Sequence, residues 1–341
     1  MDRTGFRPGV TRRRRSEAPH EGPSPMDRIP SAPLLSAAAN QIQRLQTPSV
    51  FHKIQRTSLP RRMLRRAALA LVICAVVALL GYGATVIYML HIEPSLVYDP
   101  SRPEREWMDK PNACIQDITL HTADGAMHAW YCPADKPDAV ILICHGNAGN
   151  LSIRGNGMLD YRQRYNASIM VFDYPGYGLS EGEPTEMGCY ASAAAAYDWL
   201  IKEKGFKPEQ IILYGESLGG GVAVDLASKK TVGALLLVNT FANLPEVAQR
   251  IYFWLPVTLL MHNRFDSEAK IGQCSAPIFL THGTTDRLIP PDHSKRLLEK
   301  ITAPREYLLR QGKGHEDPLG PDVLDQIHTF LVKQGCLPRR P

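Results

Sequence analysis

The chain has 341 residues, of which 44% are hydrophobic, 21% charged and 8% aromatic. This length and composition suit one large or two ordinary globular domains, and they exclude full-length disorder, a collagen-like repeat and a small disulfide scaffold. The net charge of +5 is unevenly distributed, because residues 1–66 carry +10 and the remainder carries −5. The basic charge therefore belongs to the N-terminal segment, and no nucleic-acid partner is predicted for the folded part.

Residues 1–60 are rich in Arg, Pro and Ser and contain no sustained apolar period. Such a segment cannot bury enough apolar surface to fold alone, so it is predicted to be a disordered basic tail. The run Arg12 to Arg15 is either a solvated charge cluster or a contact for an anionic surface.

A membrane anchor is predicted at residues 61–91. The run from Ala67 to Leu90 contains no charged side chain, and as a helix it would be about 36 Å long, enough to cross a hydrocarbon core of ~30 Å. The long segment before it argues against a cleaved signal peptide, and its apolar character on every face argues against a buried core helix. No second stretch of this kind occurs, which excludes a polytopic transporter.

The charges that flank this run predict its orientation. Arg61, Arg62, Arg65 and Arg66 precede it, whereas residues 91–100 contain no Lys or Arg. By the positive-inside rule, the N-terminus is predicted to be cytoplasmic and the domain at 92–337 to be extracytoplasmic.

Strand and helix patterns alternate from Leu96 onward. Ile115 to Leu120 and Met127 to Tyr131 flank the turn signal Asp124-Gly125 and predict an antiparallel hairpin. Solid apolar runs typical of buried parallel strands follow, separated by helical patterns. The predicted strands are 139–144, 168–172, 210–214, 234–238, 278–281 and 305–310, and the predicted helices are 151–164, 187–203, 218–229, 293–301 and 320–334. This order predicts one α/β domain with a mostly parallel sheet, antiparallel first strands and helices on both faces.

The clearest chemical signal is the pentapeptide Gly215-Glu216-Ser217-Leu218-Gly219, which lies between an apolar strand and a helical pattern. A tight strand-to-helix turn crowds the backbone and needs small flanking residues. It also raises the Ser hydroxyl above the sheet at a helix N-terminus. Ser217 is therefore the predicted nucleophile.

A serine nucleophile needs a general base. Eleven His residues are available, and His315 lies in a Gly-rich loop between the last predicted strand and the last predicted helix. An imidazole on such a loop can reach the strand-to-helix turn that carries Ser217, so His315 is the predicted base. His145 and His282 end strands and are interpreted as packing or loop-shaping residues. Cys144 beside His145 offers a Cys–His nucleophile as an alternative, but a strand-end Cys is usually inert packing.

The acid that orients the base should precede it in the chain. Asn239-Thr240-Phe241, which ends the strand at 234–238, offers no carboxylate, whereas Asp286 follows the next strand and is the predicted acid. Asp292, interpreted as a helix N-cap, and Asp317, two residues past the base, are weaker candidates.

An oxyanion hole requires two backbone N–H groups. Leu218, the residue after the nucleophile, is expected to supply one. The loop His145-Gly146-Asn147-Ala148-Gly149 is expected to supply the other, with Asn147 as the donor. The spacing of a phosphate-binding loop is absent, and no CxxC or HExxH motif occurs, so no cofactor or metal site is predicted.

Taken together, these motifs resemble the α/β-hydrolase family of serine hydrolases, and their order and spacing are most similar to its membrane-anchored bud-emergence (Bem-type) branch. They are His145 to Gly149, Asp173 to Gly178, Gly215 to Gly220, Thr284 to Pro290, Gly314-His315 and Trp254 to Ser267, within a resemblance that covers about 92–335. It implies an α/β-hydrolase fold with Ser217, Asp286 and His315 as the triad and Asn147 and Leu218 as the oxyanion donors. The depalmitoylating relatives anchor through an acylated N-terminal Cys cluster, whereas this chain has a spanning helix and no N-terminal Cys.

Two further features bear on function. The segment between Phe241 and Ile271, at the usual cap position, is dense in apolar side chains that either line an acyl pocket, touch lipid or pack a short helix pair. Cys114 and Cys132 flank the first hairpin and can pair if the domain is extracytoplasmic.

The chain is thus predicted to be a membrane-anchored serine hydrolase that cleaves an ester or thioester of a small acyl ester, a lipid or an acylated protein. One alternative is a serine exopeptidase, which needs carboxylates to hold a free amine. The cap region offers only Glu246, Asp266 and Glu268, spread apart in sequence. The other alternative is a non-catalytic, membrane-tethered binding protein.

Overall fold

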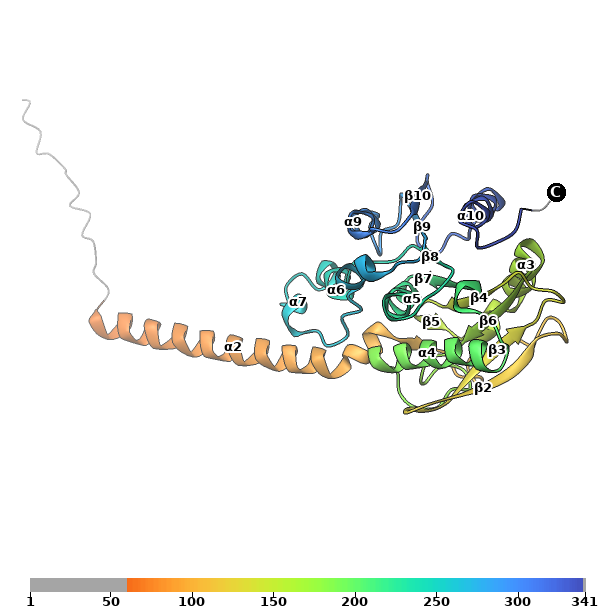
Figure 1. Cartoon of the computed structure of the whole chain (residues 1–341). Coiled ribbons are helices and arrows are strands. Elements are labelled where there is room, and N and C mark those ends of the chain that lie inside the picture. Colours follow the sequence, from red (N-terminus) through yellow and green to blue (C-terminus); the bar gives the residue numbers. More distant parts are fainter. Residues whose placement is uncertain (1–59, 340–341) are drawn as a thin grey trace, which may run out of the picture. The chain divides into compact units, whose positions relative to one another are not determined.

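The structure is a computed structural model that describes residues 60–339. The predicted tail at 1–60 lies outside these residues except for Pro60. The chain divides into two compact units, Met1–Ala70 and Leu71–Pro341. The described residues of the first unit form the first turns of helix α2 (Arg61–Val97) and the residue before it. Apart from the start of α2, the features below belong to the second unit (Figure 1).

Helix α2 contains the predicted apolar run and continues to Val97, passing through Pro94. Within residues 60–339 it is the one helix long and apolar enough to cross a membrane, and its apolar stretch is exposed rather than buried in protein. The helix ends where the Glu93 and Val97 side chains are buried against the domain.

One eight-stranded sheet forms the centre of the domain, in the order β10-β9-β8-β7-β4-β6-β3-β2. Strands β2 and β3 are antiparallel to each other, β3 is antiparallel to β6, and all remaining neighbours are parallel. The strands are β2 (Gln116–Thr122), β3 (Gly125–Cys132), β4 (Ala139–Cys144), β6 (Ala167–Phe172), β7 (Ile211–Glu216), β8 (Ala234–Val238), β9 (Ile278–Gly283) and β10 (Arg305–Arg310). A separate parallel pair joins β1 (Asp99–Pro100) to β5 (Ala148–Gly149).

The hairpin differs from its prediction by one residue. Strand β2 ends at Thr122, which pairs with Gly125 at the start of β3, so the turn residues are Ala123 and Asp124. Gly125 itself adopts a φ of 115°, a conformation that L-residues with side chains rarely adopt. The Asp-Gly signal therefore marked the turn but not its register.

Helices cover both faces of the sheet, which explains why the parallel strands are continuously apolar. Alternate side chains of β4 enter different cores: Val140 and Leu142 face one, and Ile141 and Ile143 face the other. The first core is covered by α4 (Glu186–Lys202), α5 (Leu218–Lys229) and α9 (Asp292–Lys300), and the second by α3 (Gly155–Tyr165) and α10 (Pro321–Lys333) (Figure 1). The predicted α/β architecture is thereby confirmed.

The predicted helix at 151–164 begins as a 3-10 turn, Leu151–Arg154, before α3. The cap segment consists of three short helices, α6 (Leu244–Ile251), α7 (Val257–Leu260) and α8 (Ser267–Lys270). It follows β8, and it therefore starts at the carboxyl edge of the sheet, where ligands of open α/β sheets bind.

Candidate active site

The turn between β7 and α5 holds Ser217 in a strained backbone conformation, with φ 52° and ψ −118°. The turn is crowded: a Cβ atom on Gly215 would lie 2.6 Å from the Gly219 carbonyl oxygen, and one on Gly219 would lie 2.0 Å from the Cys144 carbonyl oxygen. Only glycine fits at these two positions. The Thr240 hydroxyl donates to the Ser217 carbonyl at 2.8 Å and fixes the turn from β8.

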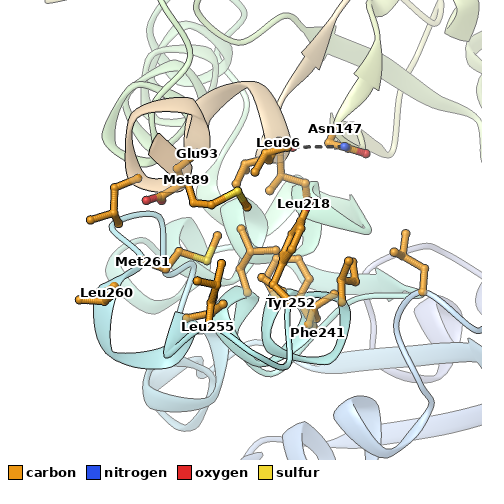
Figure 2. Close-up of a pocket in the computed structure, with 18 of the residues that line it drawn as sticks. Met89, Glu93, Leu96, Asn147, Leu218, Phe241, Tyr252, Leu255, Leu260 and Met261 are labelled. Atoms are coloured by element: carbon orange, nitrogen blue, oxygen red, sulfur yellow. Dashed lines mark hydrogen bonds between the residues drawn. The ribbon is translucent and has the colours of Figure 1, made fainter. Parts of the chain in front are cut away.

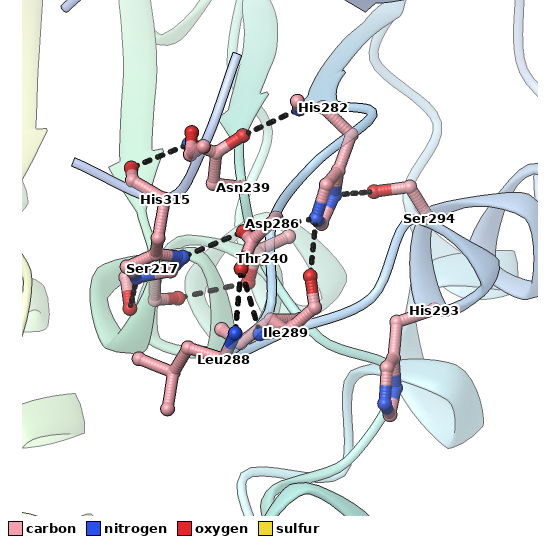
Figure 3. Close-up of polar contacts among 12 residues, drawn as sticks. Ser217, Asn239, Thr240, His282, Asp286, Leu288, Ile289, His293, Ser294 and His315 are labelled. Carbon is pink, nitrogen blue, oxygen red and sulfur yellow. Dashed lines mark hydrogen bonds and ion pairs between the residues drawn. The ribbon is translucent and has the colours of Figure 1, made fainter. Parts of the chain in front are cut away.

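The structure brings the three predicted triad side chains together (Figure 3). His315 Nε2 lies 3.0 Å from Ser217 Oγ, and His315 Nδ1 lies 2.7 Å from Asp286 Oδ2. An ionised carboxylate only accepts hydrogen bonds, so Nδ1 carries the proton and Nε2 is free to accept the Ser217 hydroxyl proton. The arrangement is that of a nucleophile, a base and an orienting acid.

Electrostatics of the pair fit these roles. Burial alone would raise the pKa of Asp286, but hydrogen bonds from His282, His315 and the Ile289 N–H outweigh it and hold that pKa well below its ordinary value. Burial alone would lower the pKa of His315, but the Asp286 carboxylate raises it above its ordinary value. Asp286 thus stays ionised and stabilises the imidazolium that proton transfer creates.

Asp286 is held in place from both of its oxygens. Its Oδ1 accepts from the backbone N–H groups of Leu288 at 3.0 Å and Ile289 at 2.8 Å. His282 Nε2 lies 3.2 Å from Oδ2 and 2.7 Å from the Ile289 carbonyl, and His282 Nδ1 lies 2.6 Å from Ser294 Oγ (Figure 3). His282 was interpreted as a packing or loop-shaping residue, and in the structure it is a buried neighbour of the acid.

Asn239 holds the loop that carries the base, a role that the sequence analysis missed. Its Nδ2 donates to the His315 carbonyl at 2.7 Å, and its Oδ1 accepts from Gly283 N–H and from Arg310, both at 3.0 Å. One signal for Asn239 was available in the sequence, namely its position at the end of the strand at 234–238. That position was considered only for the acid of the triad.

The weaker acid candidates lie elsewhere. Asp292 is exposed in the first turn of α9, whose N-cap is Pro291, so the N-cap interpretation of Asp292 was wrong. Asp317 accepts from the Gly314 N–H at 2.6 Å and shapes the loop before His315.

The expected oxyanion donors lie next to the serine. Asn147 and Leu218 line the same pocket as Ser217, and a Cβ atom on Gly146 would lie 3.7 Å from Ser217 Cβ. The side chain of Asn147 donates through Nδ2 to the Val97 carbonyl at 3.2 Å. The backbone carbonyl of Asn147 accepts from the Asp99 N–H at 3.1 Å. Within residues 60–339, no backbone hydrogen bond outside the regular helices and strands is donated by the N–H group of Asn147 or Leu218.

His145 and Cys144 have structural surroundings. His145 is buried, with Nε2 3.4 Å from Asp173 and Nδ1 2.7 Å from the Gly146 carbonyl, in agreement with a loop-shaping residue. Burial raises the pKa of the Cys144 thiol, which keeps it protonated. This disfavours the Cys–His alternative.

An apolar pocket of about 180 Å³ opens above Ser217 (Figure 2). One wall comes from the end of α2, including Met89 and Leu96, and the opposite wall from the cap, including Leu255 and Met261. The sequence analysis left the apolar cap residues open between a pocket lining, a lipid contact and helix packing; Phe241, Leu255 and Met261 are pocket-lining and buried. A contribution from α2 was not foreseen.

Two cap carboxylates that are far apart in sequence meet in space. Glu246 and Glu268 both bind the guanidinium of Arg296, which lies on α9. Their separation in sequence did not reveal this, because it is the fold of the cap that brings both carboxylates to one cation. Cys114 and Cys132 also approach each other, with their Sγ atoms 3.2 Å apart, and both are free thiols in the structure.

Comparison with known proteins identifies the family of this chain. Residues 139–267 match the sequence family described as alpha/beta hydrolase fold. An uncharacterized protein of Mycobacterium tuberculosis is 33% identical over 79% of this chain and 97% of its own length. The alpha/beta hydrolase domain-containing protein 17B of Homo sapiens is 30% identical over 68% of this chain and 81% of its own length. The chain belongs to the α/β-hydrolase family.

This membership confirms the resemblance and the fold inferred from the motifs. A third relative, an uncharacterized membrane protein of Saccharomyces cerevisiae, is 29% identical over 76% of this chain and 95% of its own length. Together with the apolar helix α2, it supports membrane association of this α/β hydrolase.

Solved structures of α/β hydrolases share the fold. The Pyrococcus furiosus esterase Pf2001 has a TM-score of 0.57 at 17% identity and covers 70% of this chain and 98% of its own. A puromycin-hydrolyzing peptidase of Mycobacterium tuberculosis has a TM-score of 0.56 at 18% identity and covers 70% of this chain and 42% of its own. Because an esterase and a peptidase share this fold, the fold alone does not identify the substrate.

Proposed function

We propose that this α/β hydrolase is a membrane-anchored serine hydrolase that cleaves the ester or thioester bond of an acyl substrate. The contact of Ser217 Oγ with His315 Nε2 at 3.0 Å, backed by Asp286, carries the proposal. A Ser hydroxyl within reach of an oriented imidazole is what acyl transfer requires.

In the proposed reaction, Ser217 Oγ attacks the acyl carbonyl carbon while His315 Nε2 takes the hydroxyl proton. The developing oxyanion accepts hydrogen bonds from the N–H groups of Leu218 and Asn147. His315 then gives the proton to the departing alcohol or thiol, and an acyl-enzyme remains. Water, deprotonated by His315, attacks the acyl-enzyme, and collapse releases the acid and returns the proton to Ser217.

The exopeptidase alternative is less well supported. Recognition of a free N-terminal amine needs uncompensated carboxylates, yet Glu246 and Glu268 both bind Arg296. The pocket lining above Ser217 is mostly apolar, which suits an acyl chain. The third alternative, a non-catalytic binding protein, gives no reason for a strained Ser217 aligned with a base and an acid.

The same proposal includes a topology. Four Arg residues precede the apolar run of α2 and none follows it up to residue 100, so the N-terminus lies in the cytoplasm and the hydrolase domain on the extracytoplasmic side. In sealed, cytoplasmic-face-out vesicles, added protease should remove an N-terminal epitope and leave the domain intact. Digestion of the domain in intact vesicles would reverse the assignment.

A substrate panel tests the activity. Detergent-purified full-length protein should hydrolyse p-nitrophenyl butyrate and an acyl thioester at least a hundredfold faster than alanyl-naphthylamide. Ser217→Ala should remove these activities, while Ser228→Ala, on the helix that follows Ser217, should keep them. Full activity of Ser217→Ala, or preference for the aminoacyl substrate, would contradict the proposal.

A further inference from the structure

The wall of the pocket contributed by α2 is part of the membrane anchor. Its lining residues Val86, Met89 and Leu90 lie within or at the end of the apolar run Ala67 to Leu90, and Leu96 and Val97 follow in the last turn. Among them, Met89 and Leu96 lie across the pocket from Leu255, Leu260 and Met261 of the cap (Figure 2). The anchor is thus a structural part of the site, in addition to holding the domain at a membrane.

A buried carboxylate fixes the anchor to the cap. Glu93 is 6% exposed, and its Oε1 accepts hydrogen bonds from the His262 N–H at 3.0 Å, the Asn263 N–H at 2.8 Å and Asn263 Nδ2 at 2.8 Å, while its Oε2 accepts from the His262 N–H at 3.1 Å. His262 Nδ1 also lies 3.1 Å from Glu93. The Tyr98 hydroxyl, just past the helix, donates to Asn263 Oδ1 at 2.7 Å. The two walls are therefore held at a defined separation.

A second contact between the two elements lies within the apolar run. The Tyr82 hydroxyl donates to the Trp254 carbonyl at 3.1 Å. From Tyr82 to Glu93 the helix rises about 16 Å, so the cap follows α2 over a distance comparable to half a hydrocarbon core. If α2 spans the bilayer, this edge of the cap lies at the depth of the acyl chains.

The composition of that edge suits such a depth. Phe253 is 80% exposed, Leu259 79% and Trp254 47%. Residues 251–261 contain no charged side chain. Exposed apolar residues gathered beside a spanning helix are typical of a surface that inserts into lipid.

The geometry points to lateral entry of substrate from the bilayer: the acyl chain of a membrane lipid ester lies between α2 and the cap, with its carbonyl at Ser217. This inference rests on the proposed function and names its substrate class. A lipid fits better than a soluble ester because both walls are apolar except for Glu93, whose oxygens bind the cap, and one wall belongs to the anchor. The bond broken is the acyl ester bond of the lipid, and the products are a fatty acid and the deacylated lipid alcohol.

The first test measures chain-length selectivity in lipid vesicles. Wild-type full-length protein should favour 4-methylumbelliferyl palmitate over the butyrate ester. Met89→Trp, which fills the wall from the anchor, should lower the palmitate-to-butyrate ratio of kcat/KM at least tenfold. Ile87→Trp is the matched control, because Ile87 is 70% exposed, lies two positions away on the same helix and does not line the pocket. It should leave the ratio unchanged.

Three outcomes would overturn the inference: an unchanged ratio in Met89→Trp, an equal loss in both variants, or a strong preference for a palmitoyl-thioester peptide over lipid esters. Hydrolysis of neither ester by the wild type would instead refute the proposed function.

The second test does not depend on catalysis. Lipids brominated along their acyl chains should quench the fluorescence of Trp254, and Trp254→Phe should remove the quenched component. Emission of Trp254 that these lipids do not quench would place the cap edge outside the hydrocarbon and contradict entry from the bilayer.

Discussion

The carboxyl edge of the sheet and the pocket above it are built in different ways. At the sheet edge, Ser217, Asp286 and His315 each follow one strand, and the parallel register of β7, β9 and β10 brings the strand ends together. The pocket walls come instead from α2 and the cap, which meet only through long-range contacts such as those of Glu93. The triad residues therefore lie directly after regular strands, whereas the shape of the pocket depends on how segments distant in sequence pack together.

The two regions also differ in polarity. At the sheet edge, Ser217, Asp286 and His315 are joined by hydrogen bonds, and loss of one partner leaves a buried polar group unsatisfied. The pocket is mostly apolar, so a single change there alters its shape and the contact area that it offers to a substrate. Large effects on rate are expected from the first region and effects on selectivity or stability from the second.

Asp286→Asn should have the largest effect considered in this comparison. The amide offers an N–H where His315 Nδ1 needs an acceptor, so the imidazole takes the wrong tautomer, and kcat should fall by about 10⁴. Esterase assays on p-nitrophenyl butyrate measure it. Asp292→Asn, at the exposed start of α9, is the control and should retain wild-type activity. Similar losses in both variants would remove Asp286 from its assigned role.

The pH profile of the wild type should show the raised pKa of His315. The base acts only when neutral, so kcat/KM should rise with pH up to that pKa and fall about tenfold per unit below it. Because the Asp286 carboxylate raises the pKa of His315, the midpoint should lie above the ordinary value of 6.5. The residual activity of Asp286→Asn should show a midpoint at lower pH. A shift to higher pH would contradict the pairing.

Asn239→Ala should lower kcat by about one order of magnitude while leaving KM nearly unchanged, because it frees the loop that positions His315 without touching the pocket. Asn239 has a φ of 47°, so alanine also introduces backbone strain. Asn166→Ala controls for that strain, because Asn166 has a φ of 48° and directly precedes β6. An equal loss of kcat in both variants would show that strain alone is responsible.

Glu93→Gln should have the smallest effect on rate and a measurable one on stability. The amide cannot accept all the N–H groups that Glu93 binds, and one unsatisfied buried donor costs about 1–3 kcal/mol. Proteolysis within the cap, or its amide hydrogen exchange, should therefore become faster. Glu104→Gln, at an exposed site, should behave as the wild type. No difference between the two variants would mean that Glu93 does not hold the cap.

Prediction from sequence succeeded where a local pattern sufficed. The apolar runs of β4 and β8 and the helix at 218–229 have the predicted bounds, because burial on both faces and the glycine-rich turn leave few alternatives. The order of motifs also placed Ser217, Asp286 and His315 on the correct loops for the observed contacts. Their catalytic roles, like the oxyanion donors, remain predictions.

What the sequence did not reveal depends on tertiary contacts. Asn239 acts on the loop of His315, 76 residues further along the chain, and His282 acts on Asp286 in the loop that follows its own strand. No spacing rule marks either residue. Glu246 and Glu268 are far apart in sequence and converge on Arg296 only through the fold of the cap. The wall from α2 could not be inferred either, since a membrane-spanning pattern carries no information about what its last turns contact.

Covalent labelling tests the central claim most directly. Full-length protein treated with a fluorophosphonate should gain one phosphonyl group, and peptide mass spectrometry should locate it on Ser217. Ser217→Ala should remain unlabelled, and Asp286→Asn should label far more slowly. An unreactive wild type, or a label on another residue that persists in Ser217→Ala, would contradict the account.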